Sequence, residues 1–112
     1  MELEAHPHDN ALVVKIKGSI DALTAEEVTN FLHAQLESGH KNMIADLAGV
    51  DFMSSAGLRV ILSTLKESRD KGGDFRLAAP QPGIEKTLNM SGFTTILKMY
   101  PTLAQAVADF AA

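Results

Sequence analysis

The chain has 112 residues, 46% of them hydrophobic, and a formal net charge of −4 at pH 7, from 10 Lys and Arg against 14 Asp and Glu. This length and near-average composition predict one soluble globular domain over residues 1–112. The absence of cysteine excludes disulfides, thiolate zinc sites and cysteine nucleophiles. Without a Lys/Arg cluster we expect no nucleic-acid binding. With no apolar run of about 18 residues and no basic signal head, we expect a cytoplasmic protein without membrane insertion.

Three strands are predicted in the first half of the chain. Residues 2–5 are typical of a short edge strand, and the turn cluster at 7–10 separates them from a β-branched strand at 11–17. Gly18 is expected to end this second strand. Residues 43–47 are apolar enough for a central position in a sheet.

A helix is predicted between the second and third strands. Thr24 and Glu27 have the spacing of a capping box, and Leu23 and Val28 that of a hydrophobic staple. Gly39 is a natural residue to end this helix. The apolar residues expected on its buried face are Val28, Phe31, Leu32 and Leu36.

The junction after the central strand organises the chain. Ser54 occupies an N-cap position and Ser55 about the first position of a second helix, which ends at the glycines 72–73. A helix N-terminus has free N–H groups and tolerates an added anion, so a phosphate on Ser55 could be accommodated. Capping alone also accounts for serine here. One helical face is predicted to carry Leu58, Ile61, Leu62 and Leu65.

The C-terminal third continues the alternation of strands and helices. Residues 74–79 and 96–100 are typical of strands, and Pro80 and Pro82 precede a short helix over about 83–89. Thr102 is expected to cap a last helix. Hydrophobic strands joined by helices predict an α/β layer structure with a mixed sheet. The last helix carries on one face Leu103, Val107 and Phe110.

The histidines do not suggest a metal site. His6 and His8 are two residues apart, which places both on one face of a strand, but two histidines supply too few ligands. His33 and His40 show no recognisable ligand spacing. We therefore predict no metal and no cofactor.

The motifs of the common enzyme classes are missing. The chain has no GxGxxG, phosphate-binding loop, GxSxG elbow or HExxH. Ser54 and Ser55 stand at a strand–helix turn, but they lack the flanking glycines of a nucleophile elbow, and His33 and His40 belong to another part of the chain. We predict that the protein is not an enzyme.

Three segments resemble the STAS domain family: residues 18–25, residues 44–58 with Ser54-Ser55-Ala56-Gly57-Leu58, and residues 89–93. Within this family the chain is similar to the stand-alone anti-sigma factor antagonists of bacterial partner-switching systems. The resemblance covers essentially the whole chain. It implies a mixed sheet of four to five strands packed against about four helices, and no catalysis.

The resemblance also implies partners and a modification site. Such proteins bind an anti-sigma factor that is also a serine kinase, are released from it by phosphorylation, and are dephosphorylated by a PP2C-type phosphatase. The family's acceptor is the second residue of an Asp-Ser-Ser-Gly or Asp-Ser-Thr-Gly tetrad, which falls on Ser55 when aligned on Gly57. Ser54 is the alternative acceptor. The residues expected to bind the partner are Asp21, Thr24, Met53, Ser54, Ser55, Ala56, Gly57, Arg59 and Ser91.

Two other functions are consistent with the same resemblance. Some single-domain STAS proteins are accessory subunits of lipid-transport ABC complexes, and these would not depend on a free Ser55 hydroxyl. A STAS switch protein acting on a target other than a sigma factor would have the same sequence features as an anti-sigma factor antagonist.

Overall fold

The computed structural model describes residues 1–111, and its centre is a five-stranded sheet in the order β1-β2-β3-β4-β5. β1 runs antiparallel to β2, and the remaining neighbours are parallel. The mixed sheet predicted from the sequence is therefore confirmed. The strands are β1 (Glu2–His8), β2 (Ala11–Ile20), β3 (Asn42–Met53), β4 (Asp74–Ala78) and β5 (Met99–Tyr100).

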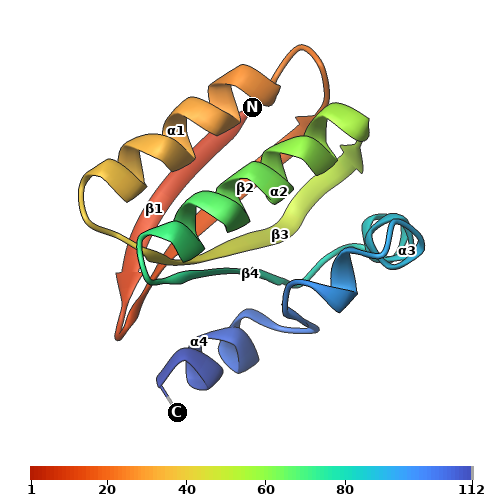
Figure 1. The fold of residues 1–112 in the computed structure, drawn as a ribbon. Helices are drawn as coiled ribbons and strands as arrows, with labels where there is room; N and C mark the ends of the chain where they lie inside the picture. The colour runs from red at the N-terminus through yellow and green to blue at the C-terminus, as the bar shows by residue number, and fades with distance from the viewer. Residues whose placement is uncertain (112) are drawn as a thin grey trace.

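Four α-helices surround the sheet. α1 and α2 lie side by side over one face of the sheet, and α4 lies against the other (Figure 1). None of the helices in residues 1–111 is long and apolar enough to cross a membrane. The helices are α1 (Ala25–Glu37), α2 (Ser55–Asp70), α3 (Pro82–Met90) and α4 (Leu103–Ala111), with a short 3-10 turn at Phe93–Thr95.

The core has two parts because the central strands are buried on both faces. On β2, Val14 and Ile16 point into the large cluster beneath α1 and α2, whereas Val13 belongs to the smaller cluster beneath α4. α4 covers only part of its face, so Lys15 and Lys17 further along β2 are exposed. Alternation along one strand thus separates helix-covered apolar positions from solvent-exposed charges.

The first three strands, β1, β2 and β3, extend beyond their predicted ends. β2 continues past Gly18 to Ile20, and β3 continues to Met53, because the two strands pair in parallel over this whole length. Gly18 has φ +121° and lies next to a register irregularity, so it bends the strand without ending it. The predicted last strand is shorter than expected, at Met99–Tyr100.

The start of α1 differs from the prediction, and its end agrees with it. Thr24 occupies the N-cap position but makes no side-chain cap, and Leu23 is 93% exposed, so both the capping box and the hydrophobic staple are wrong. Gly39 has φ +97° and donates to Leu36, and His40 donates to Gln35, which is the Schellman arrangement.

The buried face of α2 is rotated relative to the prediction. Leu58 and Leu62 are only half-buried, while small and polar residues join Ile61 and Leu65 against the sheet. α2 contacts α1 as well as the sheet, so small side chains are needed where the packing is closest. Thr64 is buried because its hydroxyl donates to the carbonyl of Val60 at 2.8 Å. The buried residues are Gly57, Val60, Ile61, Thr64, Leu65 and Ser68.

A polar cluster holds α4 against the sheet. The Tyr100 hydroxyl donates to the carboxylate of Asp109, and the Arg76 guanidinium lies 3.8 Å from the centroid of the Phe110 ring. Partial burial, followed by the hydrogen bond to Asp109, raises the pKa of Tyr100 to about 12. The same hydrogen bond holds the pKa of the Asp109 carboxyl below its usual range.

This pairing makes Tyr100 a spectroscopic probe of α4, because it is the only tyrosine in the chain. The folded state favours the neutral phenol, so its contribution to stability is present below about pH 10 and is lost as the pH rises toward 12. An ultraviolet titration of the phenolate should give a pKa of about 12. In Asp109→Asn the value should fall but stay above about 10, because burial remains. A pKa of about 10 for Tyr100 in the wild-type protein would contradict the contact between Tyr100 and Asp109.

Candidate functional site

The candidate site is the junction between β3 and α2. β3 ends at Met53, and the extended backbone of Ser54 (φ −89°, ψ −179°) precedes Ser55, the first residue of α2. The Ser54 hydroxyl accepts a hydrogen bond from the backbone N–H of Ala56 at 3.2 Å, so the predicted N-cap is confirmed. Ser55 is exposed, while Ser54 is half-buried. An anion on Ser55 would lie at the partly positive end of a 16-residue helix.

The loop between β2 and α1 lies beside this junction. The backbone N–H of Ser54 donates to the carbonyl of Ile20 over 3.0 Å, which joins the start of α2 to the end of β2. β2 and β3 run parallel, so their C-terminal ends reach the same edge of the sheet. Asp21 follows Ile20 directly, and this places it one residue from the hydrogen bond to the junction.

Thr24 organises this loop. Its hydroxyl donates to the carbonyl of Ser19 at 2.7 Å and accepts from the backbone N–H of Asp21 at 3.0 Å. A carboxylate oxygen of Asp21 accepts from the N–H of Leu23 at 2.9 Å. The Thr24 hydroxyl, which was predicted to cap α1, is therefore engaged within the loop instead. Thr24 is half-buried, and its two hydrogen bonds hold the loop in its conformation.

Gly57 and Met53 are structural members of the predicted set. A Cβ on Gly57 would lie 2.7 Å from the carbonyl oxygen of Ile20 and 2.7 Å from Cγ of Met53, so only glycine fits. Met53 is 5% exposed and belongs to the core. Both residues fix the position of the junction from beneath it and offer little surface to a partner.

Sequence reasoning missed two apolar residues on this edge. Leu23 is 93% exposed and Phe52 is 54% exposed. Phe52 pairs with Ser19 at the end of the sheet, three residues before Ser55. Both residues belong to segments that adjoin the junction, which makes them candidates for contact with a protein partner. The signal in the sequence was ambiguous, because Leu23 also had the spacing of a hydrophobic staple.

A shallow groove runs from the junction between α1 and α2. Arg59, exposed on α2, and Glu26, exposed on α1, contribute opposite charges to it. Its other lining residues are apolar or small and uncharged, so the groove offers apolar surface between two charged side chains. The lining consists of Ala25, Glu26, Thr29, Ala56, Arg59, Val60 and Ser63.

Ser91 and His33 lie outside the junction. Ser91 is the C-cap of α3, and its hydroxyl donates to the carbonyl of Thr87 at 2.8 Å. Among the hydrogen bonds of residues 1–111, none joins Ser91 to Ser54 or Ser55, so its role in partner binding stays a prediction.

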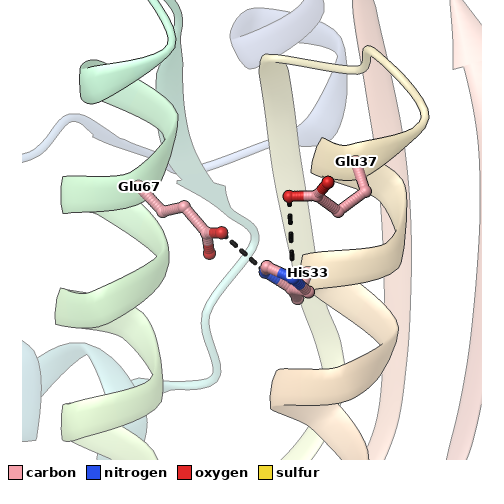
Figure 2. Close-up of side chains that lie close together, drawn as sticks. All are labelled: His33, Glu37 and Glu67. Carbon is pink, nitrogen blue, oxygen red and sulfur yellow. Dashed lines mark hydrogen bonds and ion pairs between the residues drawn. The ribbon is translucent and has the colours of Figure 1, made fainter.

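His33 pairs with carboxylates of α1 and α2 at the C-terminal ends of these helices (Figure 2).

Comparison with known proteins agrees with this arrangement. Residues 2–106 match the STAS domain. The chain belongs to the STAS domain family. A Bordetella bronchiseptica protein named "Putative anti-sigma factor antagonist BtrV" is 31% identical over 110 residues, which is 98% of this chain and 95% of that protein.

Solved STAS structures share the fold. An anti-sigma factor antagonist from Mycobacterium paratuberculosis superposes with a TM-score of 0.91 at 25% identity, over 99% of this chain and 94% of that one. The phosphorylated form of the Bacillus cell fate determinant SpoIIAA has a TM-score of 0.74 at 20% identity, over 96% and 98% of the two chains. The predicted STAS fold is thus confirmed, and within residues 1–111 it has five strands and four α-helices.

Gly57→Ala should destabilise this STAS domain. Overpacking against Ile20 and Met53 costs about 1–3 kcal/mol, offset by about 1 kcal/mol of helix propensity. We expect a net loss of up to about 2 kcal/mol in the free energy of unfolding, measured by urea denaturation. Gly83→Ala is the matched control, because Gly83 also lies in the first turn of a helix but has no atom within 4 Å of an added Cβ. Equal effects at the two positions would contradict the close approach at Gly57.

Proposed function

We propose that this protein is an anti-sigma factor antagonist that binds its anti-sigma factor through the Ser55 surface and is released by phosphorylation of Ser55. The single observation that carries the proposal is the exposed serine at the first position of α2, and exposed Leu23 and Phe52 lie in the two segments that adjoin this junction. The names of the relatives support the same role. The Ser55 surface comprises Asp21, Leu23, Phe52, Ser54, Ser55, Ala56 and Arg59.

The geometry favours Ser55 over Ser54 as the acceptor. The Ser54 hydroxyl oxygen accepts the N-cap bond and is half-buried, so it is less accessible to a kinase. Ser55 is exposed and makes no such contact in the cap. A phosphate there would meet the free N–H groups of the first turn without displacing any of the bonds that hold the junction.

Phosphorylation would act on the interface and leave the fold intact. A phosphate adds about 1.5 to 2 negative charges and three strong acceptors. A partner that covers Leu23 and Phe52 must strip water from Ser55, and stripping water from a phosphate is far more costly than from a hydroxyl. Release of the partner follows from this cost.

The partners we propose are an anti-sigma factor with serine kinase activity and a PP2C-type phosphatase. A shared fold with SpoIIAA, which has been solved in a phosphorylated form, supports a modification in this class. An accessory subunit of a lipid-transport ABC complex would bind its ATPase constitutively and would not respond to charge at Ser55. A STAS switch protein acting on a different target would also respond to charge at Ser55, and it would differ only in which partner protein it binds.

Ser55→Asp should abolish partner binding and leave the fold intact. We expect wild type and Ser55→Ala to retain a kinase-like anti-sigma factor from the native lysate, and Ser55→Asp to lose it. Unfolding free energy should change by less than about 0.5 kcal/mol, since an acidic residue suits the first turn of a helix. Retention of one ATPase or transporter component by all three proteins would refute the switch.

Leu23→Ser and Phe52→Ser should weaken binding of that anti-sigma factor at least about tenfold, because buried apolar anchors dominate interface energies. Both residues are exposed in the free protein, so stability should change little. Met90→Ser is the matched control, since Met90 is 78% exposed at the end of α3, outside the Ser55 surface. Calorimetric titration with the purified partner measures all three variants. Equal binding by the three would place the interface elsewhere.

A further inference from the structure

The C-terminal halves of α1 and α2 are joined by a cluster unrelated to the Ser55 surface. His33 Nδ1 lies 2.6 Å from a carboxylate oxygen of Glu67 on α2, and His33 Nε2 lies 3.6 Å from a carboxylate oxygen of Glu37 on α1 (Figure 2). One ligand atom from each of the three residues lies within 4.8 Å of the others. The imidazole therefore sits between two carboxylates that come from different helices.

The Glu67 contact determines which ring nitrogen is available. A hydrogen bond of 2.6 Å to a carboxylate requires a proton on Nδ1. In the neutral imidazole Nε2 then carries a lone pair, and this lone pair faces the Glu37 carboxylate. Two acceptors this close to each other favour a cation that both can bind, such as a second proton on the ring or a metal ion.

We propose that Nε2 of His33 and the carboxylate of Glu37 bind a divalent transition metal, with Glu67 as the positioning residue that holds Nδ1–H. Imidazole and carboxylate together suit Zn²⁺. Two ligands of one tetrahedral zinc ion, each about 2.0–2.1 Å from it, are roughly 3.3 Å apart, close to the 3.6 Å that separates Nε2 from Glu37. A carboxylate on the other ring nitrogen is the usual support of a zinc-bound histidine.

The surroundings suit an exposed, exchangeable site. His33 and Glu37 are spaced i, i+4 on the surface of α1, so water can complete the coordination. Lys71 Nζ lies 3.6 Å from the same oxygen of Glu37 and is the competing cation, so binding of zinc requires Lys71 to turn into solvent. A bound ion leaves Glu67 of α2 bonded to a more acidic imidazole of α1 and so strengthens the tie between the helices.

The test is calorimetric titration of the purified protein with Zn²⁺ alone, with thermal melting in the presence and absence of Zn²⁺. Wild type should bind zinc saturably and melt at a higher temperature with it. His33→Gln and Glu37→Gln should lose both effects. Glu67→Gln should weaken binding about 10–100-fold, the usual loss for a supporting carboxylate. The matched control is His6→Gln, whose exposed histidine also lies near a carboxylate, at 3.4 Å from Glu4.

The variants separate a metal site from a simple ion pair. If His33 serves only to pair with carboxylates, His33→Gln lowers the metal-free melting temperature and zinc changes neither protein. Zinc binding that survives in His33→Gln, or that disappears in His6→Gln, overturns the proposal by placing the ion elsewhere. These results are independent of whether Ser55→Asp loses its partner.

Discussion

The close approach of two backbones at Gly57 determines where the start of α2 lies relative to the end of β2, and the candidate site depends on it. The first turn of α2 lies against the carbonyl of Ile20, where no side chain fits, and the N–H of Ser54 donates to that same carbonyl. This single carbonyl therefore aligns the end of β2 with the start of α2. Ser55 and the loop that carries Asp21 therefore lie at the same edge of the sheet, each one residue away from this hydrogen bond.

The junction is held rigidly, which suits a switch that alters the chemistry of the Ser55 surface without changing the backbone conformation. The loop from Ser19 to Thr24 is held by hydrogen bonds of its own side chains, and Ser54 caps α2. The free N–H groups of the first turn offer a phosphate favourable contacts, so a change of charge at Ser55 alters hydration at the surface while the sheet beneath stays in place. Leu23 and Phe52 supply the apolar contact area. A partner can bury it when Ser55 is uncharged and cannot when Ser55 carries a phosphate.

α1 and α2 carry different chemistry at their two ends. Their N-terminal halves line the groove between Glu26 and Arg59, whereas their C-terminal halves meet through His33 and Glu67. Because the two helices pack side by side, a tie at one end helps to set the width of the groove at the other (Figure 1). The proposed zinc site and the proposed interface are thus separate in space and joined only through the helices.

Local patterns in the sequence determined the elements themselves. The apolar strands, the cap at Ser54 and the glycine stop at Gly39 depend on neighbouring residues, and all three were predicted correctly. Only the tertiary structure decided features that depend on distant partners. Parallel pairing with β2 extended β3 to Met53, and helix packing brought Glu67 of α2 to His33 of α1. Spacing along one chain carries no information about a group contributed by another element.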